Sequence, residues 1–503
     1  MNLLQRITLP CLLSGLFAGP LCIEAAGRKP NVIFILTDDQ NNDTLGCFGG
    51  KVLTPQIDRL AGEGVKFTRA YAVTGICTPS RYTCLTGQYA SRCEFGEYIT
   101  NCPPGTQANV GFNVVITPQT PNLGRALHDA GYATGFVGKW HTGWPEILPC
   151  PSDANFNDPA IAKILAENQK RMCDYVKSCG FDYAASVYRG NLKEQMNDTR
   201  AVHNQEWVTK GALDFIEQNK ERPFFLNMCT TLQHSPAPNQ SIRGDARYTP
   251  AGLLSEPLRV QAPRATIATR LKKAGIEESM GHATWLDDGV AAVIKKLEEL
   301  RLLDNTAIVF FSDNGTLKGK ATCYEGGVHV PSFLYWKGHV PSGVTCDKLV
   351  ANLDLAPTIL EICAVKPPAA MKLDGASLLP LVTGKSVKWR DDLLLEVGHT
   401  RAIVTANWKY LLLRYPPALQ EKIANGTLGR KPYHGDTVFA LHGVAEKAHP
   451  AYFDPDQLYD LEKDPWEKTN LVKDPEQKKT TVQLAARLKE QLAKIPRPFG
   501  EFK

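Results

Sequence analysis

Apolar and polar positions follow two different periods along the chain. Four short runs are continuously apolar and rich in β-branched residues, which is typical of strands buried on both faces of a sheet. These runs are residues 31–37, 133–137, 223–229 and 306–311. Four other segments carry apolar residues at helical spacing: residues 54–63, 122–130, 205–218 and 280–302. Strands that alternate with helices predict an α/β fold with a mostly parallel sheet between helices.

The pattern changes near residue 390. Short apolar runs at 393–396, 402–405 and 410–413 predict strands, and 480–492 predicts a helix. We therefore expect a large α/β domain over 27–390 and a smaller C-terminal α+β subdomain over 391–503. Residues 65–73 have strand character, and 79–86 begin a further helix. Two segments without a clear period, 150–200 and 235–275, are expected to be insertions over the sheet's edge, where substrate loops tend to lie.

The first 26 residues have the character of a secretory signal peptide. One positive charge precedes an apolar run, and Ala25 and Ala26 offer small residues for cleavage. The alternative is a membrane anchor, but two glycines and a proline interrupt a run that is barely long enough to cross a bilayer. We therefore expect residues 1–26 to be removed and the mature protein to be secreted or periplasmic.

Composition and charge describe an ordinary globular protein. The chain has 503 residues, of which 43% are apolar and 22% charged, and a formal net charge of +5. So small a charge does not favour a nucleic-acid partner, which requires a concentrated basic stripe. Fourteen cysteines are too few for a disulfide scaffold at this length. Two disulfides remain open in an oxidising compartment, Cys93 with Cys102 or Cys173 with Cys179. Three cysteines in apolar surroundings are expected to be buried thiols: Cys84, Cys229 and Cys363.

Polar residues directly follow two of the predicted buried strands. Asp38 and Asp39 come after residues 31–37, and Ser312, Asp313 and Asn314 come after residues 306–311. Ligands of open α/β sheets bind beyond the carboxyl ends of the strands. The two acidic pairs are therefore expected to share one ligand-binding rim. Taken singly, each has another explanation, since the first pair can cap a helix and Asp313-Asn314-Gly315 is a good turn sequence.

A reactive side chain and a fixed cation lie together in Cys77-Thr78-Pro79-Ser80-Arg81, which is followed by Leu85-Thr86-Gly87. Pro79 suits the start of a helix, and Cys77 and Arg81 are four residues apart, so they share one helical face. A helix N-terminus favours anions, and an arginine adds donors that match oxyanions. The motif predicts a site for a tetrahedral anion. The alternative is a buried cysteine that opens an ordinary helix.

These residues resemble the signature of the type I sulfatases, members of the alkaline phosphatase-like superfamily, and the resemblance extends from about residue 29 to residue 473. It implies an alkaline phosphatase-like α/β fold with a small C-terminal domain. It also implies that a maturation enzyme oxidises Cys77 to formylglycine (3-oxoalanine), whose hydrate is the nucleophile. Further blocks of the family supply Lys139 and His141 in GFVGKWHTG, His234 in the segment 223–236, and Lys320 before Tyr324-Glu325-Gly326-Gly327.

The resemblance also implies the roles of the site residues. The metal ligands are Asp38, Asp39, residue 77, Asp313 and Asn314, and this oxygen-rich set favours one Ca²⁺ over Mg²⁺. Arg81, Lys139 and Lys320 hold the sulfate oxygens. His234, with Lys320, protonates the leaving oxygen, and His141 takes the proton from the remaining hydroxyl. The sequon Asn314-Gly315-Thr316 is discounted, because a glycan there would destroy the metal site.

We therefore expect a sulfatase that hydrolyses a sulfate ester, with a sulfated saccharide outside the cell as the favoured substrate. Four residues are candidates to line the sugar side of the site, with ordinary packing at the rim as the alternative: Gln40, Asn41, Trp140 and Trp144. Two other functions stay open. One is a phosphoester or phosphonate hydrolase of the same superfamily, and the other is a non-catalytic protein that binds sulfated glycans. We expect no nucleic-acid partner and no stable membrane span.

Overall fold

A computed structural model gives the fold of residues 28–502 except 152, 196–200, 317, 386, 428–433 and 435–438. The predicted signal peptide, residues 1–26, lies outside the described residues. Within the described part of the chain, no helix combines the length and the apolar character that a membrane span requires.

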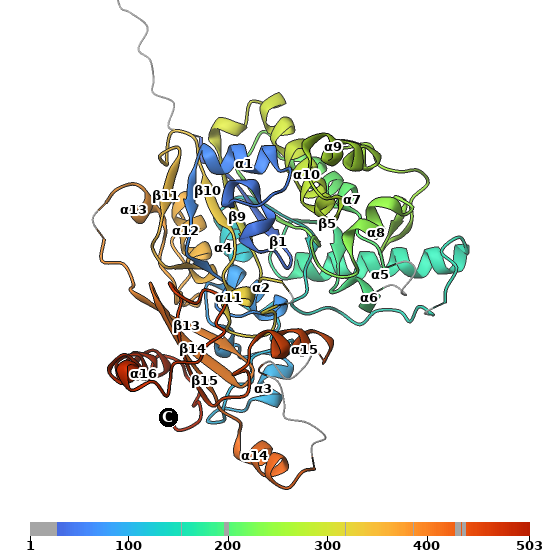
Figure 1. The fold of residues 1–503 in the computed structure, drawn as a ribbon. Coiled ribbons are helices and arrows are strands. Elements are labelled where there is room, and N and C mark those ends of the chain that lie inside the picture. Colours follow the sequence, from blue (N-terminus) through green and yellow to red (C-terminus); the bar gives the residue numbers. More distant parts are fainter. Residues whose placement is uncertain are drawn as a thin grey trace, which may run out of the picture.

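An eight-stranded sheet forms the centre of the large domain (Figure 1). Its strand order is β11-β2-β10-β9-β1-β6-β4-β5. Five neighbours are parallel: β9 (Thr306–Ser312), β1 (Asn31–Thr37), β6 (Phe224–Cys229), β4 (Ala133–Lys139) and β5 (Tyr183–Tyr188). β10 (Ser332–Tyr335) runs antiparallel to β9 and to β2 (Val65–Phe67), and β11 (Val344–Cys346) is parallel to β2. The mostly parallel α/β fold predicted from the sequence is confirmed.

Helices cover both faces of this sheet, as the continuously apolar strands predict. Alternate residues of β1 enter two different cores, with Phe34 in one and Ile33 in the other. Phe34 packs in a core that contains α2 (Cys77–Thr86), α4 (Leu123–Asp129) and α12 (Leu355–Ile362). Ile33 packs in a core that contains α1 (Pro55–Gly62), α7 (Gln205–Gln218), α9 (Ile267–Ala274) and α10 (Gly281–Glu299). Both faces of the central strands are therefore buried, and their polar side chains lie at the strand ends except for Asn227 within β6.

The segment 150–200 is more regular than its sequence suggests. It contains the long helix α5 (Pro159–Ser178) and the edge strand β5. Residues of α5 enter both cores, so the helix wraps the edge of the sheet. The sequence predicts an insertion over the sheet's edge, but the segment instead supplies the edge strand of the sheet itself. The segment 235–275 contains α8 (Pro238–Arg243), the short hairpin β7–β8 (Tyr248–Thr249, Gly252–Leu253) and α9.

Two local expectations also differ from the structure. The strand expected over 65–73 divides into β2 and β3 (Ala70–Tyr71), and β3 leaves the central sheet to pair with β12 (Val350–Ala351). Neither of the two disulfides that the sequence left open is present, and all twelve cysteines in the described residues are free thiols. Cys93 and Cys102 instead direct their sulfurs at backbone carbonyls 3.7–3.9 Å away.

A four-stranded antiparallel sheet follows the large domain. It consists of β13 (Asp392–Val397), β14 (Thr400–Thr405), β15 (Trp408–Leu413) and β16 (Asp456–Asp460), and α16 (Lys478–Leu492) packs on it. Figure 1 shows three of these strands, β13, β14 and β15, below the central sheet. Lys409 of β15 is fully buried, and its Nζ lies 2.8 Å from both Glu325 and Glu467. Since Glu325 begins α11 (Glu325–Val328), this ion cluster joins the C-terminal sheet to the large domain. The boundary after residue 390 stays a prediction.

Candidate active site

The two acidic segments meet where β1 and β9 end. These strands pair in register up to their last residues, so Asp38 and Asp313 leave the sheet at the same level. The amide of Asp39 donates to Asp313 Oδ1 at 3.2 Å, and Asn314 Nδ2 donates to Asp39 Oδ1 at 2.6 Å. All four residues are buried. The sequence-based expectation that the two pairs share one rim is therefore met.

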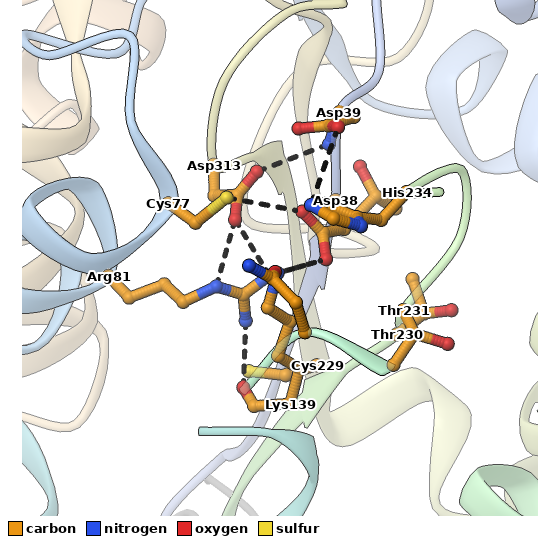
Figure 2. Close-up of polar contacts among 12 residues, drawn as sticks. Asp38, Asp39, Cys77, Arg81, Lys139, Cys229, Thr230, Thr231, His234 and Asp313 are labelled. Atoms are coloured by element: carbon orange, nitrogen blue, oxygen red, sulfur yellow. Dashed lines mark hydrogen bonds and ion pairs between the residues drawn. The ribbon is translucent and has the colours of Figure 1, made fainter. Parts of the chain in front are cut away.

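Helix α2 brings Cys77 to this rim (Figure 2). The helix begins at Cys77 rather than at Pro79, and Cys77 Sγ lies 3.6 Å from Asp38 Oδ1. The side chain has no exposed surface. Burial raises the pKa of the Cys77 thiol well above its usual value. A thiol held protonated in this way is a poor nucleophile, so residue 77 as an unmodified cysteine is ill suited to attack a substrate.

Arg81 lies on the same helical face as Cys77 and is almost fully buried. Its Nε and Nη2 contact Asp313 Oδ2 at 2.8 and 2.7 Å, and its Nη1 donates to the Lys139 carbonyl at 2.7 Å. The guanidinium therefore joins α2 to β9 and β4. A planar donor group with so many fixed partners orients the neighbouring carboxylate.

Lys139 enters the site from the end of β4. Its Nζ donates to Asp38 Oδ2 at 2.7 Å and to Asn191 Oδ1 at 2.8 Å. The strand reaches this position through a register shift at Gly138, whose φ is +93°. A Cβ at Gly138 would lie 1.7 Å from the Cys229 carbonyl oxygen, so only glycine fits there. The role of Asn191 could not be predicted, because nothing in the local sequence distinguishes it from other polar loop residues.

Lys320 contacts the opposite side of the cluster. Its Nζ lies 2.6 and 2.7 Å from the two carboxylate oxygens of Asp39. The Lys320 amide donates to the Thr316 carbonyl at 2.9 Å, so the lysine ends a short turn that follows β9. Lys139 and Lys320 thus hold two different aspartates, one on each side.

His234 directs one ring nitrogen at the site. Its Nε2 lies 3.9 Å from Asp39 Oδ2, and its Nδ1 lies 2.8 Å from the Ser235 carbonyl. A carbonyl only accepts, so Nδ1 carries a proton and Nε2 is the atom that exchanges one. Burial, helped by nearby lysines, lowers the pKa of His234 to about 4. His203, a second residue missed from the sequence, supports this loop with Nε2 2.9 Å from the His234 carbonyl and Nδ1 2.8 Å from Thr231 Oγ1.

His141 follows β4 with an unusual backbone conformation, φ +54°. Its ring is buried and packs 5.4 Å from the Phe112 ring, centroid to centroid. Burial and the charges of Lys139 and Arg81 hold the pKa of His141 well below its usual value. The ring is therefore neutral near pH 7 and able to accept a proton.

The charges of the cluster cancel. Three buried carboxylates, those of Asp38, Asp39 and Asp313, face three buried cations, those of Arg81, Lys139 and Lys320. Burial and the charge of Asp38 raise the pKa of the Asp313 carboxyl to about 7. A dication would offset the repulsion between the Asp38 and Asp313 carboxylates. A bound sulfate group would then balance the charge of the dication.

The donor set fits a hard cation. Ligand atoms of Asp38, Asp39, Cys77 and His234 lie within 4.8 Å of one another. Among the described residues, the buried Asn314 Oδ1 has no hydrogen-bond partner. An orphaned carbonyl oxygen beside two or three carboxylates is the kind of ligand that Ca²⁺ takes. The residues present therefore fit a calcium ion.

The four candidates for the sugar side do not form one surface. Trp140 is buried and packs edge-on against Phe136 and Phe181, so it belongs to the core. Gln40 is also fully buried. Asn41 hydrogen-bonds to backbone groups of Gly326 and Thr316. Trp144 alone is well exposed, with the Arg189 guanidinium 5.5 Å from its ring centroid. The expectation is wrong for Trp140 and Gln40, because their apolar or buried surroundings leave no contact surface.

The family model described as Sulfatase matches residues 30–365 of the chain. The chain belongs to the sulfatase family. A second model, described as the C-terminal part of N-sulphoglucosamine sulphohydrolase, matches residues 316–427. The matched region of the sulfatase model contains every residue of the acidic and cationic cluster.

Two relatives and one solved structure illustrate what this sulfatase is similar to. N-acetylgalactosamine-6-sulfatase of Sus scrofa is 30% identical over 397 residues, which cover 73% of this chain and 69% of the relative. N-acetylgalactosamine-6-O-sulfatase of Bacteroides thetaiotaomicron is 27% identical, with 89% and 90% covered. A structure from work on glycosaminoglycan metabolism by Bacteroides thetaiotaomicron has a TM-score of 0.63 at 24% identity and covers 92% of this chain and 99% of its own. The family and the alkaline phosphatase-like fold expected from the sequence are thus confirmed.

Proposed function

We propose that this sulfatase hydrolyses a sulfate ester of a saccharide through a formylglycine made from Cys77, with one calcium ion. The observation that carries the proposal is the position of Cys77 at the first turn of a helix, 3.6 Å from a carboxylate of the cluster. Formylglycine would supply a hydroxyl nucleophile in place of a protonated thiol. The names of the two relatives support a 6-sulfated N-acetylgalactosamine as the sulfated sugar.

Calcium would be held by oxygen atoms of Asp38, Asp39, Asp313 and Asn314, and by residue 77. When bound, the ion would polarise a sulfate oxygen and lower the pKa of the attacking hydroxyl. Arg81 fixes the orientation of Asp313, because its donors are already directed at that carboxylate. The resemblance assigned Arg81 to the sulfate oxygens, whereas its contacts support a positioning role.

The remaining side chains bind the sulfate group and move protons. Lys139 and Lys320 present buried ammonium groups on two sides of the cluster, where they can offset negative charge that shifts during sulfuryl transfer. His234 Nε2 would protonate the leaving oxygen after taking up a proton when the negatively charged substrate binds, because at a pKa of about 4 the ring without substrate is neutral near pH 7. His141, neutral near pH 7, would accept the proton of the remaining hydroxyl.

Export and maturation complete the proposal. Residues 1–26 would direct the chain out of the cytoplasm, and a partner enzyme would oxidise Cys77. In the folded protein Cys77 has no exposed surface. The maturation enzyme would therefore meet residue 77 before the chain folds.

Two measurements test the proposed function. Protein made with a maturation enzyme should carry an aldehyde at residue 77, detected by hydrazide trapping and mass spectrometry. It should cleave nitrophenyl sulfate at least about 100-fold faster than nitrophenyl phosphate, in kcat/KM. Faster cleavage of the phosphate would favour the phosphoester hydrolase. An intact Cys77 thiol and no turnover would favour the glycan-binding protein.

Removing calcium should abolish turnover and destabilise the fold. A ligand that binds only the native state adds about 2.7 kcal/mol of stability at 100 times its Kd, and removing calcium takes this contribution away. We expect EGTA to lower the melting temperature by a few degrees and to remove activity, and excess Ca²⁺ to restore both. Mg²⁺ should restore less, because it demands a smaller, more regular shell. Full activity of protein from which EGTA has removed all metal would contradict the calcium assignment.

A further inference from the structure

Trp466 stands exposed between two cavities of the C-terminal region. Its side chain is 53% accessible, although most large apolar side chains of the described residues are buried. One cavity has a volume of about 430 Å³ and is lined by three lysines besides Trp466: Lys318, Lys447 and Lys468. The other has a volume of about 470 Å³, and Trp466 and Gly326 line both.

The charged side chains that line the first cavity, called here the lysine cavity, are all positive. None of the described residues that line it is acidic. Lys318 Nζ lies 5.9 Å from the centroid of the Trp466 ring, and Lys468 Nζ donates to the Ala448 carbonyl. Within the described part of the chain, the ammonium groups of Lys318 and Lys447 have no hydrogen-bonded or ion-paired acceptor. Uncompensated positive charge around an exposed aromatic face is a site for an anionic ligand with a flat apolar side.

A single turn of the chain connects the lysine cavity to the active site. The amides of Gly319 and Lys320 both donate to the Thr316 carbonyl, at 3.2 and 2.9 Å. Lys320 at the end of this turn holds Asp39, while Lys318, two residues earlier, lines the cavity. Two residues span at most roughly 7 Å of chain. The Cα of Lys318 therefore lies within that distance of the Cα of Lys320, whose side chain spans the rest of the way to Asp39.

A residue of the C-terminal region, His449, holds this turn in place. The ring of His449 stacks on Tyr324 with centroids 3.7 Å apart, and its Nε2 lies 3.2 Å from the Lys318 carbonyl. His449 itself lines the cavity. Lys447 lies on the helix α15 (Phe439–Ala448), which ends one residue before His449. The cavity wall is thus built onto the turn that carries Lys320.

We propose that the lysine cavity binds a second anionic group, a sulfate or carboxylate, on the sugar next to the one whose ester reaches residue 77. Trp466 packs against the face of that neighbouring sugar ring. This inference rests on the proposed function and narrows its substrate to an oligosaccharide with more than one negative charge. Aryl sulfates and singly sulfated sugars leave the cavity unused.

The test compares two substrates in the matured, calcium-loaded enzyme. The first is nitrophenyl sulfate, and the second is the better cleaved of two tetrasaccharides, from chondroitin 6-sulfate and from heparan sulfate. For each variant we take the ratio of kcat/KM on the tetrasaccharide to kcat/KM on nitrophenyl sulfate. Trp466→Ala should lower this ratio about tenfold, and Lys447→Glu about tenfold, mostly through KM.

A matched control separates the cavity from the general charge of the surface. Lys463 belongs to the same region and is 84% exposed, outside both cavities. Lys463→Glu should leave the ratio within twofold. Added salt should weaken tetrasaccharide cleavage by the unaltered enzyme, and by Lys447→Glu less steeply, because one ionic contact is gone. A merely structural role of Lys447 would not change this salt dependence.

The outcomes of this test distinguish the two proposals. An enzyme that cleaves neither substrate contradicts the proposed function. An enzyme that cleaves nitrophenyl sulfate but neither tetrasaccharide contradicts the proposed role of the lysine cavity and leaves the proposed sulfatase chemistry standing. The cavity proposal is also wrong if Trp466→Ala and Lys447→Glu keep the ratio of the unaltered enzyme.

Discussion

Cys77→Ala should reduce sulfate ester hydrolysis by about 10⁴-fold or more, to the level of the background reaction. Alanine cannot be oxidised to an aldehyde, so the site would lose its nucleophile and one of its metal ligands. Cys77 Sγ contacts the rest of the cluster only weakly, at 3.6 Å from Asp38. We therefore expect the melting temperature of calcium-loaded protein to change by no more than a few degrees. Initial rates on nitrophenyl sulfate and calorimetry measure the two effects.

Cys84→Ala is the matched control for this substitution. Cys84 is buried in the same helix, seven residues further on, and belongs to the core rather than to the acidic cluster. The loss of one sulfur atom from the core should cost about 1 kcal/mol and leave kcat within about twofold. If Cys77→Ala keeps more than a hundredth of the activity, residue 77 is not the nucleophile.

Asp313→Ala should remove both calcium binding and activity, with a loss in kcat/KM of at least about 10³-fold. It should also destabilise the metal-free protein by about 3 kcal/mol, because the buried Arg81 loses its carboxylate partner at 2.7 Å. Stability and calcium affinity should be measured at pH 8, because the carboxyl of Asp313 has a pKa of about 7 and is ionised there. Urea unfolding gives the stability, and isothermal titration with Ca²⁺ gives the affinity.

Asp374→Ala tests whether the loss of stability expected for Asp313→Ala depends on the burial of the ion pair. Asp374 also pairs with an arginine, Arg92, at 2.8 Å, but both side chains are partly exposed to solvent. Partly exposed pairs contribute about 1 kcal/mol or less, so this variant should keep most of its stability and its full calcium affinity. Equal losses in the two variants would contradict the view that a dry, charge-balanced cluster holds Asp313.

Several features of the site could be predicted because they depend on local sequence. Continuous apolar runs identify β1 and β9, and the polar residues directly after them must leave the sheet at its carboxyl edge. The four-residue spacing of Cys77 and Arg81 is enough to place them on one helical face. The family signature then supplied Lys139, His234 and Lys320, which lie in the cluster, although their chemical roles stay predictions.

Other features required the folded chain. Asn191 and His203 support Lys139 and His234, yet each comes from a segment without a recognisable motif. Trp140 and Trp144 have the same sequence signal, but one lies in the core and the other in solvent. Side-chain burial depends on which elements pack above a residue, and a linear pattern does not contain that information.

The amino-acid sequence by itself determined the α/β class, the family and the side chains of the acidic rim, because these follow from local periodicity and a contiguous signature. Only the tertiary structure decided how the charges balance, since Arg81, Lys139 and Lys320 come from three different elements and select their carboxylates by proximity. It also decided that Lys318, Lys447 and Trp466 surround one cavity. Long-range electrostatics and packing act between atoms in space, whereas the sequence orders those atoms only along the chain.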